Sequence, residues 1–265
     1  MKYALVTGAY GGMGRAVTRA LVADGYLVFA LDKKIPDDGG EENVLPFATD
    51  LTDEESVRGA FAQVAKRTER LDAVLHFAGI YMLDSLVEME SEAFDKILHV
   101  NLYSAYYVNK TFLPLMRSGT KVLMTTSELA PLDPLPFTGI YAVTKAALDK
   151  YAYSLRMELQ LLGISVSVLR AGAVKTGMLG ASVEALDTFC EKTVHYRYNA
   201  ARFHEIVNRV EAKSVSPEVI GRKTLRILSK KHPAFAYTVN RNPGLLLLSL
   251  LPKRMQCALI RKILK

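Results

Sequence analysis

Tyr141 and Lys145 are the residues of this chain whose types and spacing best suit acid–base chemistry. Side chains four residues apart lie on one face of a helix, so the phenol and the ammonium are expected to point into one cleft. A free tyrosine has a pKa of about 10 and exchanges protons poorly at neutral pH, but a neighbouring cation lowers that pKa. Hydride transfer to or from an alcohol carbon needs such a group, because the hydroxyl proton must also move. A surface pair without chemistry is the alternative, since Tyr-x-x-x-Lys is common by chance.

Two more polar residues are expected to reach the same cleft. Ser127 ends an apolar run fourteen residues before Tyr141, and its hydroxyl could hydrogen-bond a carbonyl or carbinol oxygen. Asn101 opens the helical pattern before that run and could hold a water molecule that links Lys145 to solvent. The four residues together suit the oxidation of an alcohol or the reduction of a ketone.

A glycine-rich turn, Thr-Gly-Ala-Tyr-Gly-Gly-Met-Gly, separates the first apolar run from the first helical pattern. Glycines permit a tight turn and let a diphosphate approach the backbone, and the start of the helix adds free N–H groups and a positive dipole end. This position between a strand and a helix predicts a nucleotide site. The residues of the turn that we expect to bind the nucleotide are Gly8, Tyr10, Gly12, Met13 and Gly14.

Asp32 ends the second apolar run, about twenty residues after the glycines. A carboxylate there can accept hydrogen bonds from the adenosine ribose hydroxyls and would repel the 2′-phosphate of NADP, which favours NAD. Lys33 and Lys34 leave NADP open, because an ammonium could pair with that phosphate. A turn residue at the end of a strand is the alternative for Asp32.

Two further segments follow the next two apolar runs. Asp50 and Leu51 come after the third run, where Asp50 could meet the adenine amino group. The alternative is a helix cap at Asp50 or Thr52. Ala78 and Gly79 come after the fourth run and are expected to pass beside a ribose.

The elements that must position these residues alternate along the chain. Apolar runs predict buried strands and amphipathic stretches predict helices, the order typical of a parallel sheet covered on both faces. The predicted strands are Tyr3–Val6, Tyr26–Leu31, Val44–Phe47, Leu71–Phe77, Val122–Thr126 and Ile164–Leu169, with Ala234–Val239 as a candidate last strand. The predicted helices are Gly12–Asp24, Asp53–Thr68, Asn101–Met116 and Tyr141–Leu162, and a further helix starts at Ser216-Pro217-Glu218. Residues 1–265 are thus predicted to form one α/β domain, a doubly wound parallel sheet of Rossmann type, with its ligand crevice at the carboxyl ends of the strands.

Two stretches depart from this alternation. Between Asp32 and Val44 the residues Pro36 to Gly40 predict a loop or a single turn in place of a helix. From about 177 to 214 aromatic residues mix with charges, which predicts one or two helices inserted as a substrate lid. With Leu129, Leu132, Leu135 and Phe137 this lid could wall an apolar pocket for a lipophilic substrate; packing of the lid onto the domain is the alternative.

The tail from about 244 to 265 is basic and amphipathic. From Lys213 to the end the chain has twelve Lys or Arg and one acid, whereas the rest has 22 basic and 26 acidic residues. Such a tail predicts either an interfacial helix on anionic lipid or a helix that closes the pocket or a subunit interface. No nucleic acid is expected, because aromatic residues are not interleaved with these charges.

The remaining composition is that of an ordinary globular protein, with 50% apolar and 23% charged residues. No apolar stretch reaches the roughly twenty residues that span a bilayer, and we find no signal peptide. We therefore expect a cytoplasmic protein, with membrane association through the tail as an open alternative. Cys190, Cys257 and the five histidines have no metal-ligand spacing, so no metal and no disulfide is expected.

These motifs resemble the short-chain dehydrogenase/reductase family over essentially the whole chain. Within that family the chain resembles the steroid- and retinol-type members. The glycine turn, Asp32, Asp50-Leu51, Ala78-Gly79, Asn101, Ser127, Tyr141 and Lys145 stand in the order that the family uses. The resemblance implies a catalytic tetrad of Asn101, Ser127, Tyr141 and Lys145, with Lys145 also holding the nicotinamide ribose beside Tyr141. Residues 170–176 resemble the loop against the nicotinamide amide, with Val174 and Thr176 as contacts. The resemblance also implies a homodimer or homotetramer whose interface is formed by the helices starting at Asn101 and Tyr141.

The chain departs from the family pattern in a few places. His76-Phe77 stands where the family has Asn-Asn, and Ala171 stands where it has Pro. The gap from Ser127 to Tyr141 is one residue longer than typical, so Glu128 occupies the usual serine position. An ionised carboxylate cannot donate a hydrogen bond, so we select Ser127 and expect a bulge in the loop 131–136. His76 is expected to be buried at a strand end without a catalytic role.

The sequence therefore predicts an oxidoreductase that transfers a hydride between NAD and a lipophilic alcohol or ketone of steroid, retinoid or fatty type. Tyr141 would serve as the acid and base. The alternatives are an NADP-dependent ketoreductase of polar or acyl substrates and a catalytically silent sensor that binds NAD. The intact pair Tyr141 and Lys145 argues against the sensor, which needs neither.

Overall fold

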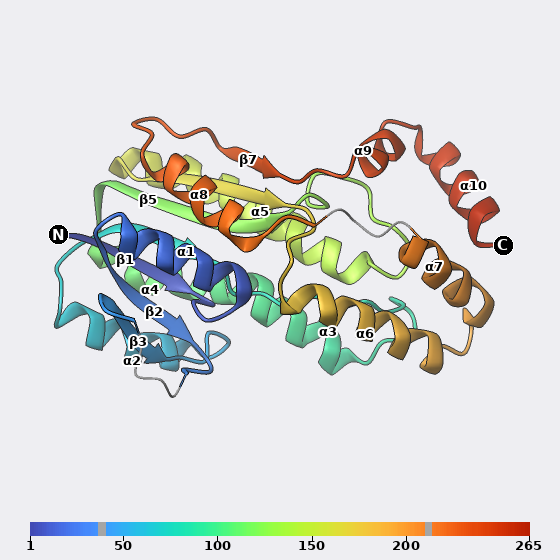
Figure 1. Cartoon of the computed structure of the whole chain (residues 1–265), viewed down its shortest axis with the longest axis horizontal. Coiled ribbons are helices and arrows are strands. Elements are labelled where there is room, and N and C mark those ends of the chain that lie inside the picture. Colours follow the sequence, from blue (N-terminus) through green and yellow to red (C-terminus); the bar gives the residue numbers. More distant parts are fainter. Residues whose placement is uncertain (37–40, 210–213) are drawn as a thin grey trace.

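The computed structural model describes residues 1–36, 41–209 and 214–265. Its strands form one parallel sheet in the order β3-β2-β1-β4-β5-β6-β7 (Figure 1). The strands are β1 (Lys2–Thr7), β2 (Tyr26–Asp32), β3 (Val44–Ala48), β4 (Leu71–His76), β5 (Met116–Ser127), β6 (Ser165–Ala171) and β7 (Ala236–Val239). The order reverses between β1 and β4, which makes their carboxyl ends the expected ligand crevice of a doubly wound sheet. The predicted fold class is confirmed.

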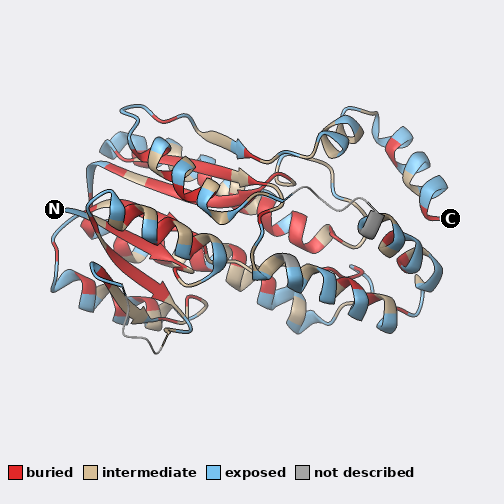
Figure 2. Ribbon diagram, in the orientation of Figure 1, coloured by how far each residue is buried: buried red, intermediate tan, exposed pale blue. Residues whose placement is uncertain are grey.

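Helices cover both faces of this sheet, and the central strands are buried along most of their length, whereas the edge strands β3 and β7 are mostly half-buried (Figure 2). The helices are α1 (Gly12–Ala23), α2 (Glu54–Ala65), α3 (Ser91–Leu98), α4 (Ser104–Phe112), α5 (Gly139–Leu159), α6 (Gly177–Lys192), α7 (Arg197–Arg209), α8 (Pro217–Leu228), α9 (Pro243–Ser249) and α10 (Lys253–Leu264). Apolar side chains of α1 and α8 pack on one face, and those of α2, α4 and α5 pack on the other. The core is thus two apolar layers separated by the sheet.

Two predicted helices begin earlier than expected. The helix predicted from Asn101 starts at Ser91, and a π-helical segment, His99–Tyr103, interrupts it before α4. The helix predicted from Tyr141 starts at Gly139, so Tyr141 lies in its first turn. The second difference is two residues, within the usual uncertainty of a helix boundary, whereas the first adds a helix of its own, α3, with an apolar face that includes the buried Ile97.

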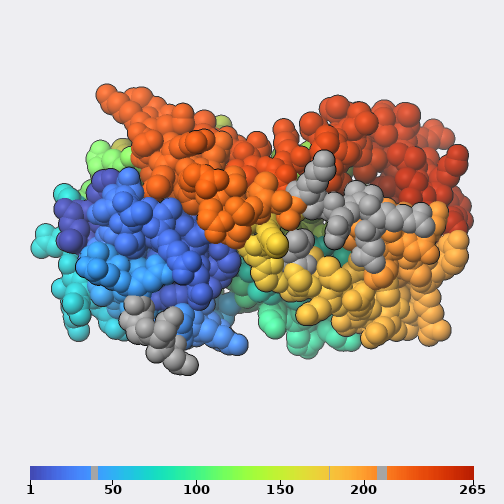
Figure 3. Space-filling model, in the orientation of Figure 1, coloured from blue at the N-terminus to red at the C-terminus, as the bar shows by residue number. Residues whose placement is uncertain are grey.

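Most other predicted elements stand close to their expected bounds, although β5 starts at Met116, six residues before the predicted Val122. β7 starts at Ala236, and α8 starts at Pro217 after Ser216. In the second crossover the described residues 33–36 and 41–43 contain no helix, whereas residues 37–40 lie outside the described part. The stretch predicted as a lid forms α6 and α7, and the tail forms α9 and α10 beside them at one end of the molecule (Figures 1 and 3).

Candidate active site

Tyr141 and Lys145 face the same buried place in the first turns of α5, as their spacing predicts. Their side chains are 9% and 5% exposed, respectively. The Lys145 Nζ lies 5.7 Å from the centroid of the Tyr141 ring and donates a hydrogen bond of 3.3 Å to the Thr125 carbonyl on β5. A buried ammonium beside a buried phenol is a pair that can move a proton without exchange with bulk water.

Burial shifts the pKa of both groups. It raises the pKa of Tyr141 to about 12, and the hydrogen bond with Ser127 offsets only part of that rise. It lowers the pKa of Lys145 to about 8. The pKa of Tyr141 is thus raised, and not lowered as its spacing to Lys145 predicts, because loss of water is its largest influence. At neutral pH Tyr141 is a neutral phenol, which can donate a proton.

Ser127, and not its neighbour Glu128, turns toward the phenol. Ser127 ends β5 and hydrogen-bonds Tyr141, and its Oγ accepts the N–H of Leu129 at 3.2 Å. The Glu128 carboxylate points to the tail, where Oε2 accepts the N–H of Asn242 at 2.6 Å. Burial raises the pKa of Glu128. Alternation of side chains at the end of a strand thus separates the two neighbours.

Asn101 lies in the π-helical segment, and its side chain makes three hydrogen bonds. Its Oδ1 accepts the N–H of Ile80 at 2.8 Å, and its Nδ2 donates to the Ile80 carbonyl and to Thr144 Oγ1, each at 3.0 Å. A Cβ on Gly79 would lie 3.2 Å from the Lys145 Nζ and 3.3 Å from the Asn101 Oδ1. Gly79, Asn101 and Lys145 therefore meet at one point, and a side chain at position 79 would push on the other two residues.

The glycine turn after β1 is packed against the ends of two other strands. Gly8 has a φ of +62°, and a Cβ there would lie 2.6 Å from the backbone N of Ala78 after β4. A Cβ on Gly12 would lie 2.6 Å from the side chain of Thr176, which precedes α6. The turn, Ala78 and Thr176 thus converge at the carboxyl ends of the strands, where a nucleotide would bind backbone N–H groups and the start of α1. This arrangement fits a nicotinamide dinucleotide.

The acidic residues of the predicted adenosine end also lie on this edge. Asp32 Oδ2 accepts the N–H of Tyr10 at 3.0 Å, and Oδ1 accepts that of Lys34 at 3.3 Å. Lys33 pairs with Asp50 at 2.6 Å. This ammonium, together with hydrogen bonds from Thr52, lowers the pKa of Asp50 to about 2.

The predicted alternative of a cap at Asp50 or Thr52 is wrong, because Asp53 caps α2 by accepting the N–H of Glu55.

Four of the residues predicted to bind the cofactor use their side chains to pack the protein interior. Leu51 and Val174 are buried in the core, and Tyr10 and Met13 pack against it. These residues can offer a nucleotide their backbone more readily than their side chains.

The other side of the Tyr141 phenol is apolar. The ring of Tyr81 lies 4.9 Å from that of Tyr141, in a cluster that includes Met82, Met89 and Leu129. Tyr81 also joins a second cluster, in which Phe137 packs on three aromatic side chains of the lid. Sequence reasoning missed Tyr81, although its position two residues after Gly79 at the end of a central strand was a usable signal.

Two carboxylates tie the lid to the loop that follows β4. Glu88 accepts the N–H groups of Val194 and His195 at 3.0 and 2.8 Å and the Thr193 hydroxyl at 2.6 Å. Asp84 is 3% exposed and pairs with Lys192 at the end of α6. The turn between α6 and α7 is therefore held by polar contacts as well as by the aromatic cluster.

Two further features lie away from the site. His76 is buried and shares a hydrogen bond of 3.0 Å with Asn109, as expected for a strand-end residue.

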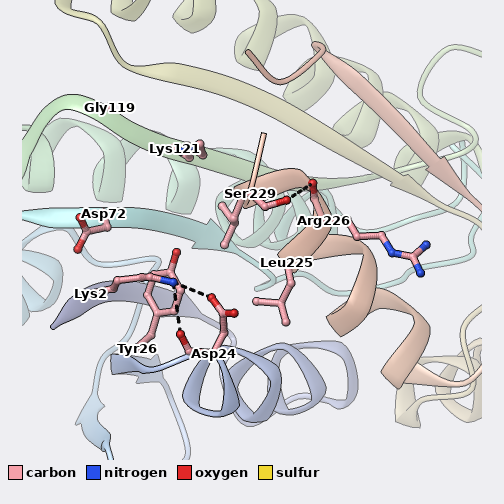
Figure 4. A pocket seen from close by; sticks show the side chains of 10 residues that line it. Lys2, Asp24, Tyr26, Asp72, Gly119, Lys121, Leu225, Arg226 and Ser229 are labelled. Atoms are coloured by element: carbon pink, nitrogen blue, oxygen red, sulfur yellow. Dashed lines mark hydrogen bonds and ion pairs between the residues drawn. The ribbon is translucent and has the colours of Figure 1, made fainter. Parts of the chain in front are cut away.

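An open groove of about 570 Å³ lies at the amino ends of the strands, opposite Tyr141. Its lining residues include Lys2, Asp24, Tyr26 and Asp72 (Figure 4). Among the described residues, no group of three or more His, Cys, Asp or Glu could hold a metal ion.

Comparison with known proteins identifies the family of this chain. A family model described as short chain dehydrogenase matches residues 2–187. Estradiol 17-beta-dehydrogenase 2 of Mus musculus is 30% identical over 91% of this chain and 68% of that protein. The 3-ketodihydrosphingosine reductase of Bacteroides thetaiotaomicron is 24% identical over 87% of this chain and 85% of that protein. The crystal structure of a short-chain dehydrogenase from Streptomyces avermitilis has the same fold, with a TM-score of 0.78, 21% identity and coverage of 99% and 96% of the two chains.

The chain belongs to the short-chain dehydrogenase/reductase family. It is an oxidoreductase that depends on NAD or NADP.

Proposed function

We propose that this protein transfers a hydride between NAD and a lipophilic alcohol or ketone of steroid, retinoid or fatty type. The observation that carries the proposal is the apolar surround of the Tyr141 phenol, from the ring of Tyr81 to the aromatic cluster under the lid. A pocket that is apolar apart from a few polar groups at one end suits such molecules. The names of two relatives specify estradiol and 3-ketodihydrosphingosine, which supports the same class.

In this proposal the chain's own groups handle the proton and the substrate oxygen. Tyr141 donates its proton to a ketone oxygen, or accepts one from an alcohol, while Ser127 hydrogen-bonds the same oxygen. The neutral phenol at pH 7 carries the proton that the reduction of a ketone requires. Lys145 stabilises the phenolate that forms and holds the nicotinamide ribose, and Asn101 keeps Lys145 beside a water. The bound nicotinamide supplies or accepts the hydride.

The proposed cofactor contacts follow the carboxyl edge of the sheet from one end to the other. The adenosine would lie at Asp32, Asp50 and Leu51, and the diphosphate on the glycine turn, Gly8 to Gly14. The nicotinamide half would lie between Ala78-Gly79 and the residues Val174 and Thr176. NAD is favoured over NADP because Lys33 is already paired with Asp50, which leaves the Asp32 carboxylate as the dominant charge at the ribose.

Replacement of Tyr141 by Phe removes the proton donor and keeps the ring. We expect kcat to fall by about 10²- to 10⁴-fold with little change in NAD binding. Turnover is followed by the absorbance of the reduced nicotinamide, with a panel of lipophilic and polar alcohols and ketones. Tyr153→Phe is the matched control, because Tyr153 lies on the same helix and is 46% exposed. Undiminished activity of Tyr141→Phe would exclude this role. Tight NAD binding without turnover of any substrate by the wild type would support the sensor.

Replacement of Asp32 by Ser removes the carboxylate that we expect at the ribose hydroxyls. Loss of hydrogen bonds to a charged acceptor should raise KM for NAD by about 10- to 100-fold, while KM for NADP should fall because the repulsion of its phosphate is gone. Both constants are measured with one substrate, and Glu42→Ser, an exposed acid nearby in the chain, is the control. A wild-type preference for NADP would instead support the alternative ketoreductase.

A further inference from the structure

The tail contains an apolar helix that the described part of the protein covers only in part. Residues 245–251 include six leucines, and all seven residues of α9 are described and none of them is buried. Leu247 and Leu250 are 67% and 73% exposed. Exposed leucines in such a group are unusual on a monomeric soluble protein and mark an interaction surface.

The helix α10 extends this apolar surface. Gln256 and Leu264 are buried toward the rest of the molecule, and the Leu264 carbonyl accepts a hydrogen bond from Asn199 of α7. Met255, Leu259 and Ile263 recur every fourth residue and are 55%, 40% and 43% exposed. At that spacing they form one row along the helix.

Basic side chains flank this row. Arg254, Arg261, Lys262 and Lys265 are exposed on α10 and the residue after it, and no acidic residue occurs in the chain after Glu218. A row of apolar side chains beside a row of basic ones is the pattern of a helix that lies in the interface of an anionic membrane. A second copy of the chain would bring the same positive charges face to face, which disfavours it as the partner.

We propose that α9 and α10 form a docking surface for an anionic lipid bilayer, with the leucines of α9 and the row on α10 in the acyl boundary and the basic residues at the phosphates. The red segment in Figure 3 shows this tail on the outside at one end of the molecule. Among the described residues no helix is long and apolar enough to cross a membrane, so the contact proposed is peripheral.

The tail also rests on the loop that follows the catalytic serine. Asp133 donates its N–H to Ser249 Oγ at 3.2 Å, and its carboxylate accepts from Gln256 at 2.7 Å. Glu128, next to Ser127, holds the N–H of Asn242 before α9. A docked tail would therefore bring the apolar surroundings of Tyr141 close to the bilayer, from which a lipophilic substrate could enter. This consequence rests on the proposed function, whereas the docking itself does not.

The test measures sedimentation of the full chain with vesicles of phosphatidylcholine alone and of an equimolar mixture with phosphatidylglycerol. We expect binding to the mixed vesicles and little to the neutral ones. Arg261→Gln/Lys262→Gln should weaken binding by about 30-fold, as removal of two charges near an anionic surface predicts. The matched control, Lys230→Gln/Lys231→Gln, removes two exposed charges after α8, next to the groove at the amino ends of the strands, and should stay within about twofold of the wild type.

A second pair of variants tests the apolar part without removing the buried Leu264. Leu247→Ser/Leu250→Ser should also lose binding, while Leu161→Ser/Leu162→Ser, which replaces leucines 83% and 55% exposed elsewhere, should not. The proposal is overturned if the wild type ignores the mixed vesicles, if it binds both kinds equally, or if the tail variants bind like their controls. If a tail variant still binds the vesicles but has half the molecular mass of the wild type, the tail is instead an interface with a second copy of the chain. No cofactor or substrate is present, so failure of the dehydrogenase proposal leaves this result unaffected.

Discussion

Burial sets the protonation of the groups on which the site depends. Lys145 is charged at neutral pH but close to losing its proton, because its pKa is about 8. Tyr141 and Tyr81 are both neutral, since loss of water raises the pKa of each to about 12. Desolvation always favours the uncharged form, so a single physical cause acts in opposite directions on the base and on the two acids. We therefore expect ketone reduction to decline as the pH rises above 8 and Lys145 loses its charge.

His76 carries a separate pH dependence, which acts on stability. Burial lowers its pKa from 6.5 to about 4, so the unfolded chain binds a proton at a higher pH than the folded one. The neutral ring stabilises the fold fully above pH 6.5. This stabilisation is lost as the pH falls from 6.5 through the folded-state pKa of about 4. From pH 7 to 4.5 we expect a loss of about 2 kcal/mol from this group.

Urea unfolding of the wild type and of His76→Gln at the two pH values isolates that loss. The amide of Gln does not titrate and can still reach Asn109, whose Oδ1 lies 3.0 Å from the histidine. The variant should therefore lose about 2 kcal/mol less than the wild type on acidification. Equal losses in the two proteins would show that His76 is not the group responsible.

At the scale of elements, the sequence predicts strands better than the starts of helices. The long apolar runs of the central strands admit one interpretation, and each predicted strand is present. Asn101, in contrast, lies within a helical stretch that starts ten residues earlier, although Phe94, Ile97 and Leu98 already stand at helical spacing before it. The choice of Ser127 over Glu128 follows from the sequence, because only the hydroxyl can donate a hydrogen bond when the acid is ionised, whereas the contact of Tyr81 with Tyr141 depends on the path of the loop after β4.

Glu88 is one of the two carboxylates that hold the lid, and it accepts three hydrogen bonds from the turn between α6 and α7. Replacement of Glu88 by Ala leaves the N–H groups of Val194 and His195 without their acceptor. We expect these two amides to exchange hydrogen faster by about an order of magnitude, and KM for the substrate to rise while kcat changes less. Amide exchange followed by mass spectrometry checks this. Glu92→Ala, an exposed acid on α3, should exchange like the wild type. Unchanged exchange in Glu88→Ala would mean that the aromatic cluster alone holds the lid.

At the scale of the whole molecule, α4 and α5 leave an apolar face outward. They lie together, since Asn109 donates a hydrogen bond of 3.3 Å to the Tyr151 hydroxyl. Tyr106 on α4 and Met157 on α5 are 42% and 50% exposed, although both helices also bury a full apolar face against the sheet. Helices that are apolar on two faces need a second partner. This supports the homodimer or homotetramer proposed from the family resemblance, with these two helices at its interface.

The variant Tyr106→Glu/Met157→Glu tests that assembly. Introducing two charges into the centre of an interface should raise the dissociation constant by about 30-fold or more, because the carboxylates lose water without gaining partners. Light scattering coupled to size-exclusion chromatography, over a dilution series, gives the mass. Val183→Glu/Tyr198→Glu adds the same charges at exposed positions of the lid and should keep the wild-type mass. A wild type that stays monomeric at all concentrations, or an equal loss of mass in both variants, would place the interface elsewhere or remove it.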